Sequence, residues 1–237
     1  MNSPIILSLN HNLADADVLV KQTRPHIGMI KIGLSMWAEH GSECLSLAKN
    51  YNISVLLDLK LHDIPDVVAR TTDKLCSHLS VIKGNHFLSV HCFGGPLMCN
   101  AAKQVAEHSN TNIVGVTLLT SLDETDIGKF GYRDRRPGPK TVDLAFVGKN
   151  IPHELNHFMC APVNVPLLRQ YLENDVIITS GIRAETDDLG SHKRTKPMSF
   201  ALKSGANWVV IGRPITTAFD PSVAAEEFKI KAEKYII

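Results

Sequence analysis

The sequence lacks the features that mark membrane, secreted and nucleic-acid-binding proteins. Its longest apolar runs, such as Trp208–Ile211, are far shorter than the ~18 residues of a membrane-spanning helix. Its first residues lack the basic region that opens a signal peptide. Charge of one sign is also missing, because 25 Lys and Arg balance 24 Asp and Glu. We therefore expect no membrane or nucleic-acid partner, and any bound anion must be held by a local site.

Cysteine is sparse, and no pair has the Cys-x-x-Cys spacing of redox and zinc sites. The five cysteines are scattered among apolar neighbours, which indicates buried free thiols in a reducing cytoplasm. The eleven histidines are not expected to hold a metal. A hydrophobic fraction of 44% with 21% charged residues excludes a disordered chain and indicates a compact, soluble one.

Short apolar runs alternate with longer segments of helical period along the whole chain. The runs are continuous, as in strands buried on both faces of a parallel sheet. Eight strands are predicted, at residues 4–9, 28–32, 54–59, 87–91, 113–118, 157–160, 175–179 and 208–211. A helix is predicted after each, at residues 14–23, 35–49, 66–80, 97–107, 142–149, 165–171, 197–203 and 222–234. Eight such units predict an α/β fold, a closed (β/α)₈ TIM barrel that forms a single domain over residues 1–237; a doubly wound sheet, without a Rossmann glycine fingerprint, is the second choice.

Two connections differ from the others in composition. Residues 124–140 are polar and contain Gly and Pro, which predicts a helix followed by a surface loop whose role stays open. Residues 182–196 are charged and follow a predicted strand. Loops longer than ~12–15 residues are usually functional, and in a barrel the loops after the strands form the active face. Residues 182–196 are therefore expected beside the active site.

Three ionisable residues lie at the end of the third predicted strand: Asp58, Lys60 and Asp63. Asp58 and Lys60 are two residues apart, so both face the barrel interior. Lys31 interrupts the apolar second strand, where an unpaired ammonium is costly, and Asp58 is its expected partner. A purely structural ion pair would add little stability. We therefore predict an alternating array of these four charges that acts as a dry, preorganised electrostatic site.

Glycine and arginine follow the last two predicted strands. Residues 180–183 are Ser-Gly-Ile-Arg, and residues 211–215 are Ile-Gly-Arg-Pro-Ile. In barrels these two loops commonly bind phosphate through backbone N–H groups, which glycine lets the ligand approach closely. Each motif alone is a common turn, but both in this order predict a phosphate site containing Arg183, Gly212 and Arg213.

The ends of two other strands carry weaker signals. Thr120 and Ser121 follow the fifth strand, where their hydroxyls suit a ring amide or a sugar. A helix cap explains Ser121 equally well. His91, at the end of the fourth strand, is interpreted as a structural histidine and not as a base.

These motifs resemble the orotidine 5′-phosphate decarboxylase family, in the family's order and over nearly the whole chain. The most specific is DLKLHDIP at residues 58–65. The others are LSLN at 7–10, KIG at 31–33, VHCFGG at 90–95, VTLLTS at 116–121, SGIR at 180–183, GSHKR at 190–194 and IGRPIT at 211–216. The resemblance implies a (β/α)₈ homodimer without metal or organic cofactor that converts orotidine monophosphate to uridine monophosphate in pyrimidine biosynthesis.

The resemblance also implies roles for individual residues. Lys60 would protonate the pyrimidine carbon as carbon dioxide leaves, and Asp58 would disfavour the substrate carboxylate relative to the transition state. Asp63 would reach into the partner subunit's site and help to hold Lys60. The implied substrate-binding residues are Asn10, Lys31, Ile64, Val67, Thr120, Ser121, Arg183, His192, Gly212 and Arg213.

Four positions depart from the family's usual pattern. Asn10 stands where the family usually has Asp, Val67 where it has Thr, Ser180 where it has Pro and His192 where it has Gln. A lost hydrogen bond typically costs about 0.5–1.5 kcal/mol, so these changes are expected to weaken substrate binding. They leave the four-charge array intact.

Two other functions remain open. A phosphosugar decarboxylase or aldolase of the same suprafamily would typically need a divalent metal and would lack the His-Asp-Ile-Pro continuation at residues 62–65. A catalytically weakened barrel could instead bind a nucleotide as a sensor or scaffold. Asn10, Val67 and His192 favour that alternative, whereas Lys60 argues against it.

Overall fold

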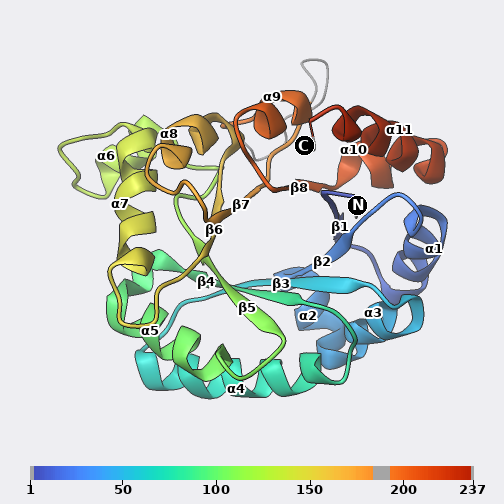
Figure 1. The fold of residues 1–237 in the computed structure, drawn as a ribbon, viewed down its shortest axis with the longest axis horizontal. Helices are drawn as coiled ribbons and strands as arrows, with labels where there is room; N and C mark the ends of the chain where they lie inside the picture. Colours follow the sequence, from blue (N-terminus) through green and yellow to red (C-terminus); the bar gives the residue numbers. More distant parts are fainter. Residues whose placement is uncertain (1–2, 184–192, 236–237) are drawn as a thin grey trace.

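Eight parallel strands close into a barrel in chain order, with β8 paired to β1. The computed structural model describes residues 3–183 and 193–235. The strands are β1 (Ile5–Leu9), β2 (Met29–Gly33), β3 (Ser54–Leu61), β4 (His86–His91), β5 (Thr111–Val116), β6 (His157–Cys160), β7 (Val176–Thr179) and β8 (Trp208–Ile211). Helices surround this ring of strands, as Figure 1 shows down the barrel. The predicted (β/α)₈ barrel is confirmed.

The outer layer consists of helices that follow the strands in sequence. The α-helices are α1 (Leu13–Thr23), α2 (Leu34–His40), α3 (Ser46–Tyr51), α4 (Pro65–Ser80), α5 (Gly95–Ala106), α6 (Glu124–Lys129), α7 (Pro137–Lys149), α8 (Val165–Arg169), α9 (Met198–Lys203), α10 (Arg213–Thr216) and α11 (Pro221–Glu233). Short 3₁₀ helices are η1 (Gly41–Leu45), η2 (Cys92–Gly94) and η3 (Pro162–Asn164).

The predicted boundaries differ from the structure mainly where glycine or proline ends or begins a helix. The helix predicted at 35–49 is divided into α2, η1 and α3, because Gly41 caps α2 with a positive φ of 55°. Helix α7 begins at Pro137, five residues earlier than predicted, with proline in its first turn. The helix and loop predicted at 124–140 are α6 and residues 130–136.

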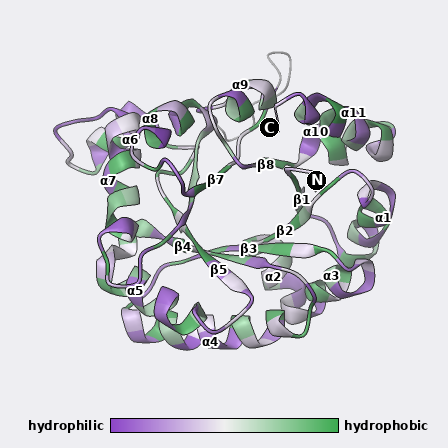
Figure 2. Ribbon diagram, viewed as in Figure 1, coloured by the Kyte–Doolittle hydropathy of each residue, from purple (hydrophilic) through white to green (hydrophobic). Residues whose placement is uncertain are grey.

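Two apolar layers stabilise the barrel, one inside it and one between the strands and the helices. Strand β3 shows the alternation that produces them. Leu57 and Leu59 pack outward against the helices, whereas Leu56 belongs to the interior cluster with Ile6 and Phe87. The strands are accordingly mostly green in Figure 2, whereas the helices carry both colours. Inward-facing positions farther along the strands are therefore free to carry polar side chains at the barrel's C-terminal end.

The expectation of buried free cysteines agrees with the described structure. All five cysteines are free and buried. Over residues 3–183 and 193–235, no helix is both long and apolar enough to cross a bilayer.

Arg169, at the end of α8, forms hydrogen bonds with both connections that lead into β7 and β8. Its guanidinium donates hydrogen bonds to four backbone carbonyls and one side-chain amide, those of Leu172, Glu173, Asp175, Gly205 and Asn207. Loss of one such bond typically costs about 0.5–1.5 kcal/mol.

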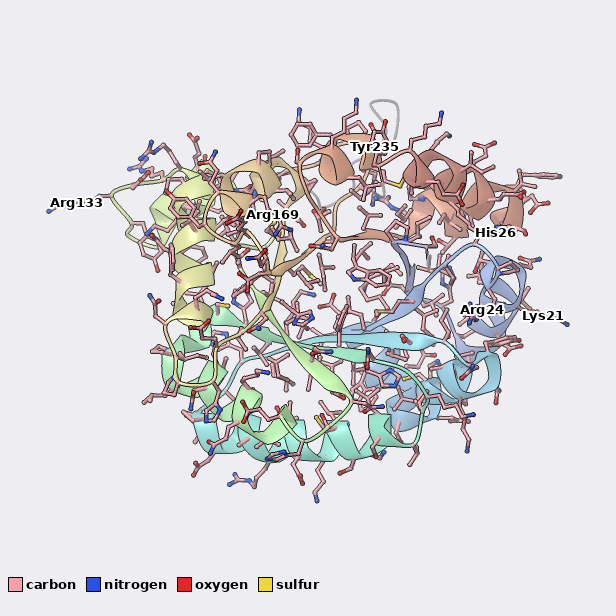
Figure 3. All side chains as sticks on the ribbon, in the orientation of Figure 1. Lys21, Arg24, His26, Arg133, Arg169 and Tyr235 are labelled. Carbon is pink, nitrogen blue, oxygen red and sulfur yellow. The ribbon has the colours of Figure 1, made fainter. Side chains whose placement is uncertain are left out.

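We expect Arg169→Ala to lower the free energy of unfolding by about 3 kcal/mol, because several carbonyls lose their shared donor. Urea denaturation measures the change. Arg133→Ala is the matched control, since Arg133 extends into solvent while Arg169 lies within the fold (Figure 3). Equal stabilities of the two variants would contradict this role of Arg169.

Candidate active site

A cavity of about 540 Å³ opens at the C-terminal end of the barrel strands. This is the end at which barrel enzymes place their active sites. The cavity brings together residues that are far apart in sequence and were predicted from separate motifs. Those predicted residues are Asn10, Lys31, Asp58, Lys60, Thr120, Ser121, Arg183, Gly212 and Arg213.

Asp58 is the centre of a buried charge cluster on β2 and β3. Its Oδ2 atom lies 2.7 Å from Lys60 Nζ and 3.6 Å from Lys31 Nζ. Its Oδ1 atom accepts a hydrogen bond of 2.9 Å from the Ser89 hydroxyl on β4. Asp58 is only 5% exposed, so these partners replace the water that a carboxylate needs. Two cations share one carboxylate, which leaves the cluster suited to a further negative charge.

The same contacts explain the acid–base properties of the cluster. Burial by itself would raise the pKa of Asp58, but the charges of Lys31 and Lys60 and the hydrogen bonds to Lys60 and Ser89 outweigh it and lower that pKa. Burial lowers the pKa of Lys31, and the neighbouring Lys60 adds to this effect, while Asp58 opposes it. Asp58 is therefore held ionised, and Lys31 depends on it to keep a proton.

An unusual backbone conformation positions Lys60. The pairing of β3 with β4 shifts register between Leu57 and Leu61, and Lys60 within this irregular stretch has a φ of +50°. Non-glycine residues in this left-handed region are typically strained by about 1–3 kcal/mol and persist where neighbouring contacts hold them. The contact here is a 2.8 Å hydrogen bond from the Lys60 backbone N–H to Ser89 Oγ. The Ser89 hydroxyl therefore holds both the Lys60 backbone and the Asp58 carboxylate.

We expect Ser89→Ala to lower kcat about 10- to 100-fold, because a hydrogen bond to a charged group is worth about 1.5–3 kcal/mol. The loss should fall on kcat more than on KM, since Ser89 does not line the cavity. Steady-state kinetics measure it. Ser109→Ala is the control, because its hydroxyl bonds only near the N-terminal end of β5. Unchanged kcat in Ser89→Ala would contradict the positioning role.

The loops after β7 and β8 place two arginines in the cavity. Gly181 has a φ of +88°, a conformation that favours glycine, and the backbone N–H of Arg183 donates to Lys196 O at 3.2 Å. Gly212 caps α10, whose first residue is Arg213. Both arginines line the cavity. This arrangement suits an anion such as a phosphate, as the sequence predicted.

Asn10 and Lys31 approach each other across Gly33. A Cβ atom added at Gly33 would lie 3.1 Å from Lys31 Nζ and 3.4 Å from Asn10 Oδ1. The glycine therefore leaves room for these two polar groups at the cavity edge. Asn10 supplies an amide oxygen and no charge at this position.

Within one chain, the structure brings together three of the four predicted charges, namely those of Lys31, Asp58 and Lys60. Asp63 is exposed on the rim, where its carboxylate accepts a hydrogen bond from the backbone N–H of Ile64. Asp63, Ile64 and Val67 do not line the cavity of the single chain. The reason is their position beyond the end of β3, at the start of α4. The prediction for His192 lies outside the described residues.

Two residues beside the cavity received no individual role from the sequence, although the resemblance implied that residues 190–194 form part of a closing loop. Ser89 occupies an inward-facing position of β4, where its hydroxyl meets Asp58. A serine within an apolar strand next to the strand of Asp58 was the sequence feature that could have indicated it. Arg194, at the end of the GSHKR motif, is buried behind the connection that follows β5. Nothing in the sequence showed which way its side chain turns.

The expectation of no metal assumes that no two histidines have the His-x-x-x-His spacing of metal ligands, and one pair does have it. Residues 153–157 read His-Glu-Leu-Asn-His, which binds zinc when it lies on a helix. These residues are not helical: His153 bonds to Glu107 at 2.8 Å, and His157 begins β6, where it packs on Phe87. Over residues 3–183 and 193–235, no three His, Cys, Asp or Glu side chains group as a metal site.

Fold and cavity together define a (β/α)₈ barrel whose active-face cavity is lined by a lysine–aspartate cluster and by two arginine-bearing loops. Comparison with known proteins identifies the family. A family model described as "Orotidine 5′-phosphate decarboxylase / HUMPS family" matches residues 3–228. The chain belongs to this family.

Individual relatives agree with this assignment. The chain is 34% identical over 228 residues to orotidine 5′-phosphate decarboxylase of Wolbachia sp. subsp. Brugia malayi, covering 94% of this chain and 96% of that protein. It is 33% identical to the enzyme of that name from Sphingopyxis alaskensis, covering 97% and 99%. The crystal structure of orotidine 5′-phosphate decarboxylase from Lactobacillus acidophilus superposes with a TM-score of 0.79 at 26% identity, covering 98% and 99%.

Proposed function

We propose that this protein is a carboxy-lyase that converts orotidine 5′-monophosphate to uridine 5′-monophosphate and carbon dioxide, a step of pyrimidine biosynthesis. The observation that carries the proposal is the cluster of Lys31, Asp58 and Lys60 in a cavity that also contains Arg183 and Arg213. The substrate matches this arrangement, because it carries a carboxylate at the reacting carbon and a phosphate at the other end.

The chemistry follows from the placement of charge. When the bond to the carboxylate breaks, its electron pair stays on the ring carbon as carbon dioxide departs. The Lys60 ammonium stabilises this carbanion and donates a proton to it. Asp58 is ionised and buried, so it repels the substrate carboxylate in the ground state and is relieved when that charge moves to the ring. Lys31 keeps Asp58 in place and contacts the ribose side.

The phosphate is proposed to bind between the loops that follow β7 and β8. Arg183 and Arg213 would hold its oxygens, with Gly212 allowing close approach of the backbone. Thr120 and Ser121 would contact the ring, and Asn10 would contact the ribose. Binding energy from this remote group then positions the ring against Lys60. The residues themselves supply the acid and the charges, so no metal or organic cofactor takes part.

The protein is further proposed to act as a cytoplasmic homodimer, without a nucleic-acid or membrane partner. Apolar side chains are exposed at the beginnings of the helices that follow β2, β3 and β4: Leu34, Ile64, Phe93 and Leu97. They lie at the same end of the barrel as the cavity, beside Asp63. Burial of this surface against a second copy would bring the partner's Asp63 toward Lys60, and Ile64 and Val67 toward the partner's substrate.

A mixture of two inactive variants tests the shared site. We expect Lys60→Ala and Asp63→Asn homodimers each to be nearly inactive. After dissociation and random reassociation, half of the dimers are mixed and each contains one intact site, which should restore about a quarter of wild-type activity. Light scattering checks that dimers form. No recovery in mixed dimers would contradict the crossing of Asp63.

Turnover of the nucleotide tests the reaction itself. Purified protein should remove the absorbance of orotidylate with release of carbon dioxide, and EDTA should leave the rate unchanged. Activity on a keto-sugar phosphate that disappears with EDTA would favour the phosphosugar branch of the family, which the family description includes. Binding of uridine monophosphate without turnover would favour a nucleotide-binding protein, the alternative motivated by Asn10, Val67 and His192.

A further inference from the structure

Arg194 makes an unusual set of contacts behind the cavity wall. Its Nη2 atom donates to Leu118 O at 2.9 Å and to Leu119 O at 2.7 Å. Its Nη1 atom donates to Asn164 Oδ1 at 2.8 Å, in the connection after β6. Its backbone N–H points to Thr120 O at 3.3 Å. One residue from the β7 side therefore binds the connections that follow both β5 and β6.

This guanidinium is buried, and burying its charge costs free energy. Arg194 is 8% exposed, and no carboxylate forms an ion pair with it among the described residues. Its Nε atom is buried and has no hydrogen-bond partner within residues 3–183 and 193–235. A buried charge normally needs close compensation. Neutral carbonyl and amide oxygens supply it here, which indicates that the side chain serves to hold these groups in place.

What it holds is part of the cavity lining. Leu118, Leu119, Thr120 and Ser121 all line the cavity, and they follow the end of β5 without regular secondary structure. The Leu118 carbonyl accepts from Arg194, and the Leu119 carbonyl accepts from Arg194 and from the backbone N–H of Leu122. A segment without regular secondary structure depends on such tertiary hydrogen bonds to keep its shape.

The neighbouring Lys193 makes the same connection at the surface. Its Nζ atom lies 2.8 Å from Asp123 Oδ2 and 2.7 Å from Asp126 Oδ2, and its backbone N–H donates to Thr120 O. Its side chain is 46% exposed. Exposed ion pairs contribute little, so Lys193 provides a control that also contacts the segment after β5 but holds it more weakly.

We propose that Arg194 is a positioning residue that fixes the cavity wall at residues 118–121 for the ring of the bound nucleotide. The inference rests on the proposed function, which puts the pyrimidine ring against Thr120 and Ser121. It separates two parts of ligand recognition: Arg183 and Arg213 hold the phosphate, whereas Arg194 acts only through the wall that contacts the ring.

Two ligands that differ by the ring distinguish this role from a general structural one. Uridine 5′-monophosphate contains the ring, ribose and phosphate, whereas ribose 5-phosphate lacks the ring. Calorimetry would measure both with wild-type protein, Arg194→Met, Arg194→Lys and the control Lys193→Met. Methionine fills similar space without donors, and lysine keeps the charge and part of the hydrogen bonding. Thermal unfolding of each variant establishes that it is folded at the assay temperature.

Arg194→Met should bind uridine monophosphate at least about tenfold more weakly, while its affinity for ribose 5-phosphate stays within about twofold of wild type. Arg194→Lys should be intermediate, and Lys193→Met should resemble wild type. Two results in a folded Arg194 variant would overturn the positioning role and leave the proposed function standing. One is an equal loss of affinity for both ligands, and the other is unchanged affinity for both. Wild-type protein that fails to bind uridine monophosphate would overturn the proposed function and this role with it.

Discussion

Replacing Lys60 with alanine is expected to lower kcat for orotidine 5′-monophosphate by about four orders of magnitude, the upper end of general acid–base effects. Lys60 Nζ is 2.7 Å from the carboxylate of Asp58, so it is held at one place in the cavity. Lys31 is the other described lysine that lines that cavity, and its Nζ atom lies farther from Asp58 Oδ2, at 3.6 Å. The variant therefore loses the proton donor and one charge that stabilises the carbanion.

Lys21→Ala is the matched control for Lys60→Ala. Lys21 extends from α1 into solvent, away from the cavity, and its replacement should leave kcat unchanged (Figure 3). Lys60→Ala should still bind uridine monophosphate, because the phosphate loops are intact. If kcat falls less than about tenfold in Lys60→Ala, Lys60 is not the acid.

Asp58→Asn is expected to lower kcat by about 10²–10³-fold, the typical loss when one preorganised electrostatic group is removed. Asparagine keeps the shape and a hydrogen-bond acceptor for Ser89, but it removes the charge that both lysines share. Burial already lowers the pKa of Lys31, and Asp58 opposes that effect. The variant should therefore lose the repulsion of the substrate carboxylate and also part of the charge on Lys31.

The split between kcat and KM checks this interpretation. The substrate carboxylate no longer meets a buried negative charge in Asp58→Asn, so KM should stay equal or fall while kcat falls. Asp73→Asn, at an exposed position of α4, is the control and should match wild type. A large rise of KM with unchanged kcat would mean that Asp58 only binds the substrate.

The architecture was predictable because eight strands buried on both faces leave continuous apolar runs. All eight were located, and β6 and β8 with the observed ends. The short α10 was not, since four residues after Gly212 carry no helical period. The irregularity at Lys60 was also invisible, because the left-handed conformation of a lysine depends on the β4 partner and not on local propensity.

The site was predictable where charge interrupts an apolar strand. Lys31 and Asp58 were paired from sequence because neither could be buried alone, and the structure places them 3.6 Å apart. The roles of Ser89 and Arg194 could not be predicted in this way. A serine in a strand costs little, and an arginine in a charged loop resembles a solvated one until its burial is known.

Decarboxylation in deuterium oxide tests the central claim most directly, namely that the lysine–aspartate cluster removes carbon dioxide from the ring and protonates the carbon left behind. Mass spectrometry of the product and quantification of the gas give both halves of the reaction. We predict one carbon dioxide for each uridine monophosphate formed, and one carbon-bound deuterium at the position that held the carboxylate. Unchanged orotidine monophosphate after prolonged incubation with the folded protein at millimolar substrate would contradict the account.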